Sequence, residues 1–189
     1  MTQQIQDTII FNGKSCNILA LSSDLDFSPT KEFGLDLTMW GTANYRGFWC
    51  EYKIENKKFS IHTMTVYTRS GQYPTIHSVN PMPEKQAYDL SKRINFRIPI
   101  SWQYKNLDYP YPFTGKLVIE IQENAINYSK KLDNIVLELE IDQGVLISVN
   151  DISKLWLQFQ QHHLPKYSYW WQDPEKSYEQ FINFRSIMG

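Results

Sequence analysis

The chain has 189 residues, 42% of them hydrophobic and 21% charged, a balance that suits one packed domain and excludes intrinsic disorder. The 19 basic and 20 acidic residues give a net charge of −1, without the basic excess typical of nucleic-acid binders. The sequence has no apolar run that could cross a bilayer and no secretory-signal pattern at its start, so we expect no membrane contact and a cytoplasmic location.

The first half predicts two β-hairpins. Asn12-Gly13 separates the apolar runs 7–11 and 14–21, and both residues accept the positive φ of a tight turn. Residues 22–34 are polar and predict a loop. Residues 45–54 then alternate between apolar and polar, and 59–68 return after a turn. The predicted inward residues of the outgoing strand are Phe48, Cys50, Tyr52 and Ile54.

The middle of the chain is less regular. Pro83 suits the first turn of a short helix over 83–94, and an alternating strand follows over 94–104. Pro99 cannot donate to a β-ladder, which predicts an edge or a bulge there. A stiff aromatic loop over 109–113 precedes another strand over 116–122.

The last third predicts a hairpin and a helix. Residues 134–141 pair with 145–149, with the leucines of the first strand inward and Glu138 and Glu140 in water. Residues 152–159 fit a helix or a strand. Asp173-Pro174-Glu175 begins a helix. Its predicted amphipathic face comprises Tyr178, Phe181, Ile182 and Arg185.

These elements predict a mainly β (α+β) fold as a single domain over residues 1–189. The sheet is largely antiparallel and built from hairpins, as a sandwich or a partly open barrel. The C-terminal amphipathic helix packs on the sheet or caps an open barrel end.

Catalytic and metal-binding motifs are absent from the sequence. The four histidines, 62, 77, 162 and 163, lack zinc-ligand spacing, and no nucleophile elbow or phosphate-binding glycine loop occurs. We therefore predict no catalytic residue, no metal and no cofactor. Cys16 and Cys50 are interpreted as reduced core thiols.

Carboxylates offer the one enzyme-like hypothesis. Glu120, Glu138 and Glu140 project opposite to the inward leucines and isoleucines of their strands. If these strands are neighbours, the acids converge as in a glycosidase. The plainer interpretation is a water-facing surface with Lys116 and Lys131 as partners.

Aromatic residues cluster in segments that we expect to be loops or strand ends. Beside an arginine, such residues can anchor a partner; they can equally plug the ends of a sheet. The predicted binding residues are Tyr45, Arg46, Tyr109, Tyr111, Trp170 and Trp171.

The segment Tyr45-Arg46-Gly47-Phe48, which leads into a hairpin, resembles a bacterial family of uncharacterised small β-rich proteins. Members carry an aromatic-Arg-Gly-aromatic segment, and residues 113–119 and 135–146 match later strands. The likeness departs at Trp49-Cys50 and after Asp151. It implies a β fold and transfers no activity. Some genes of this kind resemble parts of toxin–immunity neighbourhoods, which implies an immunity-type role by analogy.

We therefore expect a non-catalytic cytosolic binding protein with a protein partner, in its specific form an immunity-type inhibitor of a bacterial toxin. The alternative is a small-ligand-binding or hydrolytic β-barrel or sandwich protein with a carboxylate-lined pocket. A third hypothesis is a homo-oligomer formed through a strand edge near Pro99. The sequence leaves the oligomeric state open.

Overall fold

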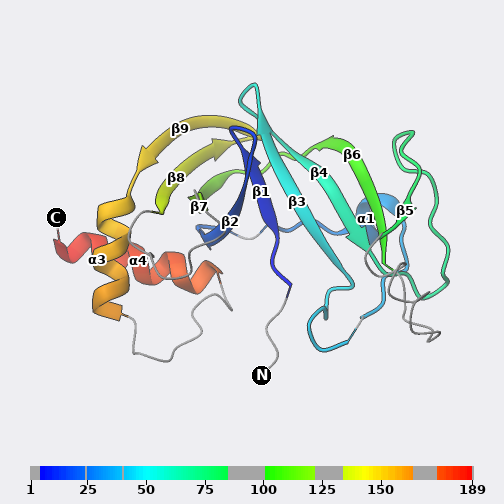
Figure 1. The fold of residues 1–189 in the computed structure, drawn as a ribbon, viewed down its shortest axis with the longest axis horizontal. Helices are drawn as coiled ribbons and strands as arrows, with labels where there is room; N and C mark the ends of the chain where they lie inside the picture. Colours follow the sequence, from blue (N-terminus) through cyan, green and yellow to red (C-terminus); the bar gives the residue numbers. More distant parts are fainter. Residues whose placement is uncertain are drawn as a thin grey trace. The chain divides into compact units, whose positions relative to one another are not determined.

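The computed structural model describes residues 5–23, 25–39, 41–84, 101–121, 134–163 and 174–188, and it confirms a mainly β fold with a C-terminal helix (Figure 1). The strands are β1 (Thr8–Phe11), β2 (Lys14–Leu21), β3 (Phe48–Glu55), β4 (Lys58–Val66), β5 (Met82–Pro83), β6 (Trp102–Pro110), β7 (Gly115–Ile121), β8 (Ile135–Asp142) and β9 (Val145–Asp151). The helices are α1 (Pro29–Phe33), α3 (Ser153–His163) and α4 (Pro174–Met188).

The predicted hairpins are confirmed, and their turns carry the expected backbone angles. Asn12 and Gly13 join β1 to β2 with φ values of 51° and 73°. Gln143 and Gly144 join β8 to β9 with φ values of 47° and 75°. Two successive residues with positive φ are the mark of the hairpin turn whose twist matches the flanking strands. The inward residues of β3 are buried as predicted: Phe48, Cys50, Tyr52 and Ile54.

The chain divides into two compact units. The first unit comprises Met1–Asp7, Asp26–Tyr52 and Ser60–Tyr109, and the second comprises Thr8–Leu25, Lys53–Phe59 and Pro110–Gly189. Strands β3 and β4 each contribute residues to both units. The single-domain assignment therefore stays a prediction, and the units are described separately.

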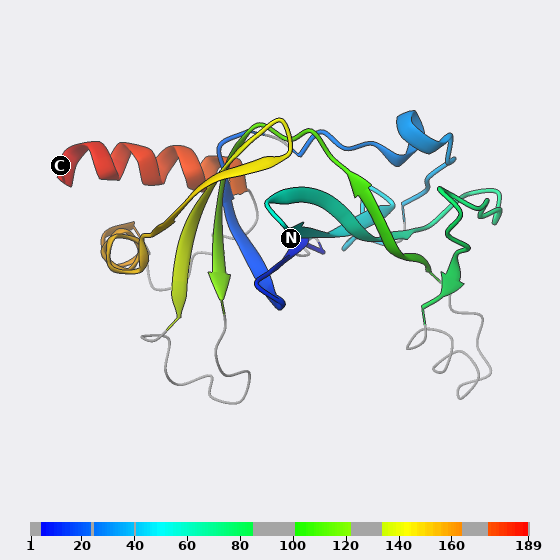
Figure 2. The same ribbon diagram turned by 90° about the horizontal axis from the view of Figure 1, so that it is seen from above.

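The second unit is built on antiparallel neighbours β1, β2, β7, β8 and β9. Both α3 and α4 lie over one face of this sheet (Figure 2). Because the helices cover a second face, Leu117, Val118 and Ile119 of β7 are all buried. The residues packed between the helices and the sheet are Ala20, Val118, Val136, Ile152, Trp156, Phe159, Tyr178, Phe181 and Phe184.

The structure resolves one open alternative and corrects one helix face. Residues 153–163 are helical, so the strand interpretation of this segment is wrong. On α4, Tyr178, Phe181 and Phe184 are buried, whereas Ile182 is exposed. The prediction placed Ile182 on the packed face because it is apolar. In the structure, Phe184 packs against the sheet instead.

The first unit contains the hydrogen-bonded neighbours β4, β6 and β5, with β3 beside β4. Strand β6 extends to Pro110, so Tyr109 lies in a strand and not in the predicted loop. Pro83 ends β5 instead of starting a helix. Residues 29–33 form α1 within a predicted loop, with Ser28 capping the helix by accepting from the Lys31 N–H.

Two of the predicted elements fall outside the described residues. These are the remainder of the helix over 83–94 and the first part of the strand over 94–104, including Pro99. Among the helices that the structure describes, none has the length and apolar character needed to cross a bilayer.

Candidate functional site

The loop over residues 38–47 of the first unit, with residue 40 outside the described part, is held closed at its base. The Tyr67 N–H donates to the Gly47 carbonyl at 2.8 Å, and the Thr38 N–H donates to the Tyr67 carbonyl at 3.0 Å. Gly47 has a φ of 74°, and a Cβ atom there would lie 2.5 Å from the Thr38 carbonyl oxygen. Compact loops with joined ends frequently carry function. We call this segment the 38–47 loop.

The N-terminal segment pins the flank of the 38–47 loop. The Ile5 N–H donates to the Ala43 carbonyl at 2.8 Å. Arg46 donates to both oxygens of the Asp7 carboxylate, at 2.9 Å and 3.1 Å. The Cys50 N–H donates to the same carboxylate at 2.8 Å. Bidentate arginine–carboxylate pairs fix both distance and orientation, so Arg46 is held in place.

Tyr45 and Arg46 remain accessible on this pinned loop. Tyr45 is 59% exposed, and the Arg46 side chain is 45% exposed. The guanidinium of Arg46 lies 4.8 Å from the centroid of the Phe48 ring, within the range of a cation–π contact. Met39, also in the loop, is 54% exposed. The loop therefore presents an aromatic, a cationic and a thioether side chain from a fixed backbone.

Tyr109 belongs to an aromatic cluster that connects to Arg46. Its hydroxyl donates to the Glu32 carboxylate at 3.0 Å, and its ring packs edge-on against Phe33 at 5.2 Å. Phe27 contacts both Tyr109 and Phe48, at centroid distances of 6.5 Å and 6.1 Å. Burial and the hydrogen bond with Glu32 raise the pKa of the Tyr109 phenol.

Of the remaining predicted anchors, one belongs to the second unit and two lie outside the described residues. Tyr111 belongs to the second unit, where its ring lies 6.1 Å from that of Phe59 and its N–H donates to the Phe59 carbonyl. Trp170 and Trp171 lie outside the described residues. Binding by Tyr45, Arg46, Tyr109, Tyr111, Trp170 and Trp171 stays a prediction.

The three carboxylates share one face of the second unit's sheet, as the glycosidase hypothesis required. In the β7–β8 register, Glu138 stands opposite Val118 and Glu140 opposite Lys116, while Glu120 stands opposite Val136. The Glu120 carboxylate accepts from the Asn134 amide at 2.9 Å. Glu140 accepts from the Ser148 hydroxyl at 3.1 Å.

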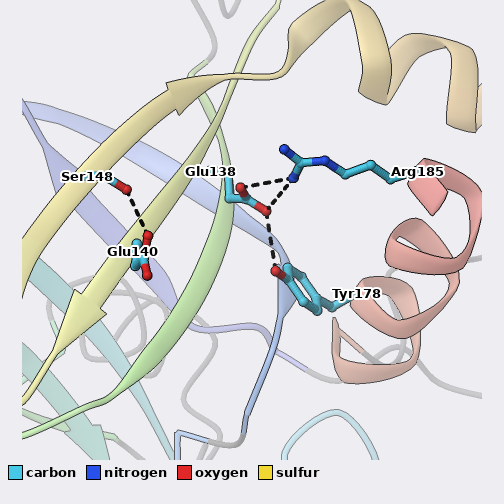
Figure 3. Close-up of polar contacts among 5 residues, drawn as sticks. All are labelled: Glu138, Glu140, Ser148, Tyr178 and Arg185. Carbon is cyan, nitrogen blue, oxygen red and sulfur yellow. Dashed lines mark hydrogen bonds and ion pairs between the residues drawn. The ribbon is translucent and has the colours of Figure 1, made fainter. Parts of the chain in front are cut away.

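The prediction that Glu138 faces water is wrong, because α4 covers it (Figure 3). Glu138 is 1% exposed; Arg185 donates to its two oxygens at 3.4 Å and 3.2 Å, and the Tyr178 hydroxyl donates to one of them at 3.3 Å. Burial, and then the Glu138 charge, raise the pKa of Tyr178 to about 12, against the opposing effect of Arg185. We call these three residues the Glu138 cluster. Its contacts anchor α4 on the sheet.

A histidine–aspartate pair was not predicted. His62 of β4 and Asp108 of β6 approach to 2.7 Å between Nδ1 and Oδ1. Strands β4 and β6 are neighbours in the sheet, and Asp108 has a positive φ of 44°. Within the described segments, no group of three or more His, Cys, Asp or Glu residues is arranged to hold a metal ion.

Cys16 and Cys50 are buried and free, as predicted. Burial raises the pKa of both thiols, most strongly at Cys50. A buried thiol with a raised pKa has little thiolate character and is a poor nucleophile. These cysteines therefore act as core residues.

Compared with protein-family models, with curated proteins and with solved structures, the chain matches none of them.

Proposed function

We propose that the protein is a non-catalytic binding protein for another protein, and that the 38–47 loop is its docking surface. The observation that carries this proposal is the exposure of Tyr45 and Arg46 side by side on a loop fixed at its base and flank. Tyrosine and arginine are enriched among the residues that dominate interface energies. A pre-organised loop also loses less conformational freedom on binding.

The chemistry of the loop favours an apolar and aromatic contact over a charge-steered one. Asp7 offsets the charge of Arg46, so the pair produces little net positive electrostatic field. The guanidinium can still stack its flat face against a partner and donate from its remaining N–H groups. Met39 can adapt to an irregular partner surface. We therefore propose a partner that buries Tyr45 in a pocket and stacks against Arg46.

The proposed partner is a toxin-type protein, with this chain as its immunity-type inhibitor in the cytoplasm. The family resemblance of the Tyr45–Phe48 segment suggests this form. The resembling segment includes the two exposed loop residues Tyr45 and Arg46, whereas its Gly47 and Phe48 are buried. A rigid surface that presents an aromatic side chain is suited to covering the active site of a toxin-type partner.

The alternative, a carboxylate-lined ligand pocket, has less support. Glu138 is covered by α4 and bound by Arg185 and Tyr178. Glu120 and Glu140 also have protein partners, Asn134 and Ser148. A glycosidase uses two carboxyl groups, one on each side of the glycosidic bond that it cleaves, and both must be free to reach the substrate.

Affinity capture tests the proposal. Tagged wild-type chain and the variants Tyr45→Ala and Met39→Ala are used as bait in lysate from cells that naturally encode the protein. The matched control is Ile187→Ala, which truncates an 80% exposed residue of α4 in the second unit. We expect a partner with the wild type and the control that the loop variants lose, with unchanged circular dichroism. Co-expression of a captured toxin should then be tolerated only with loop-intact chain. Equal recovery by all four proteins contradicts the proposal.

A further inference from the structure

Strand β9 of the second unit carries three exposed aliphatic residues. Val145, Ile147 and Val149 are 44%, 58% and 43% exposed, and they alternate with the partly buried Leu146 and Ser148. Because of the register shift, Val149 lies opposite Leu139 and Val145 lies opposite Asp142, so these two valines lie on opposite faces of the sheet.

The outer edge of β9 is paired only at its beginning. Its inner edge pairs with β8 from Val145 to Asp151. On the other side, β4 pairs with it at Lys58↔Val145, and the Leu146 N–H donates to the Lys57 carbonyl. Within the described residues of the second unit, no strand pairs with the outer side of 147–151 (Figure 1).

The hydrogen-bond phase shows which backbone groups this edge offers. The Ile152 N–H donates to the Val136 carbonyl of β8. The backbone N–H and C=O groups of successive residues alternate between the two edges of an antiparallel strand. The backbone groups of Asn150 and Ser148 therefore also point toward β8. The backbone N–H and C=O groups of Val149 and Asp151 point to the open side. The register shift opposite Ile147 forms a bulge, which limits the regular open edge to the residues after it.

Charges of opposite sign mark the two ends of this edge. Lys57 and Lys58 are exposed at the start of β9, and Asp151 is exposed at its end. Hydrogen bonds from Ser153 lower the pKa of Asp151, which keeps it ionised. An antiparallel second copy of β9 would place its acidic end beside the basic end of the first. The edge is therefore complementary to itself.

We propose that two copies of the chain pair through β9, antiparallel about a two-fold axis at Val149. Val149 then exchanges backbone hydrogen bonds with the partner's Val149, and Ile147 lies opposite the partner's Asp151, near Lys58. Because a two-fold interface uses the same patch on both copies, it closes as a dimer and does not extend into a filament.

Analytical ultracentrifugation of the full chain tests the proposal with Val149→Pro. Proline removes the N–H that points to the open side and leaves the β8 ladder intact, so the fold should be retained. We expect a wild-type dimer and a monomeric variant over the same concentration range, with unchanged circular dichroism. Ile187→Lys, a matched change of an exposed isoleucine on α4, should stay dimeric.

Two further variants keep the test decisive if the proline variant does not fold. Ile147→Lys should dissociate the dimer, because it places a charged side chain on the strand edge that pairs. Lys58→Glu should weaken it by about tenfold, since two symmetric attractions become repulsions. A monomeric wild type overturns the proposal, as does a dimer that persists in the folded variants at Val149 or Ile147. Either result leaves the proposed function of the 38–47 loop untouched.

Discussion

Arg185 of α4 donates from Nη1 to both carboxylate oxygens of Glu138 in β8, a residue 47 positions earlier in the chain. The Glu138 side chain is 2% exposed, and the Arg185 side chain is 46% exposed. The pair thus joins a buried anion to a cation that still reaches water. Such a pair contributes less to net stability than to the orientation of α4 on the sheet. Few other positions of the helix would give the buried carboxylate of Glu138 its hydrogen-bond donors.

Glu138→Ala should destabilise the second unit by about 2 kcal/mol, because it removes the acceptor of the Tyr178 hydroxyl. Arg185 limits the loss, since its half-exposed guanidinium can be rehydrated. Urea unfolding measures the change. Glu140→Ala is the matched control on the same strand face. Its partner is the partly exposed Ser148, so it should change the free energy of unfolding by less than about 1 kcal/mol. Equal effects at the two positions would contradict the anchoring role.

Stability should fall in alkaline solution through Tyr178. Its pKa is about 12 in the folded chain, against about 10 when unfolded. Above pH 10 the unfolded chain loses this proton first, so ionisation favours unfolding until the pH passes about 12. Tyr178→Phe should unfold with a shallower pH dependence over that interval. Tyr104, also near 12, keeps part of the slope in the variant. If the free energy of unfolding depends on pH equally in the wild type and the variant, Tyr178 is not the cause of the alkaline loss of stability.

Local patterns in the sequence predicted the hairpins but not the burial of Glu138. Asn12-Gly13 and the alternation through β3 act between near neighbours, so they are visible in a short window. The burial of Glu138 depends on α4, which lies far along the chain and covers a face that alternation alone assigns to water. The available signal is Arg185, a cation on the same predicted amphipathic helix face as Tyr178 and Phe181.

The candidate site was predicted in part for the same reason. Tyr45 was recognised by its residue type and setting, and it is exposed. The partner of Arg46, however, is Asp7, at a separation of 39 residues, which no spacing rule indicates. The pairing of His62 with Asp108 likewise joins two neighbouring strands, at a separation of 46 residues.

Asp7→Ala should loosen the 38–47 loop. The change leaves Arg46 and the Cys50 N–H without their acceptor, at a cost of about 1–3 kcal/mol. Hydrogen exchange should show faster labelling of residues 43–50 in the variant. Asp36→Ala is the control, because it removes the carboxylate that accepts from Ser70 elsewhere in the first unit. Unchanged exchange over 43–50 in the Asp7 variant would show that Asp7 does not pin the loop.

Gly47→Ala should disrupt the 38–47 loop far more than Gly41→Ala. Both glycines have positive φ, 74° and 71°, so alanine carries a backbone penalty of about 1–2 kcal/mol at either position. At Gly41 the added methyl group meets no atom within 4 Å, whereas at Gly47 it would lie 2.5 Å from the Thr38 carbonyl oxygen. That oxygen is backbone, so the base of the loop must open and the hydrogen bonds of Tyr67 to Gly47 and Thr38 must lengthen. We expect a loss of more than about 3 kcal/mol for Gly47→Ala in urea unfolding. Partner capture should be lost with it and kept by Gly41→Ala. Equal stability of the two variants would show that the base of the loop is not closed by this contact.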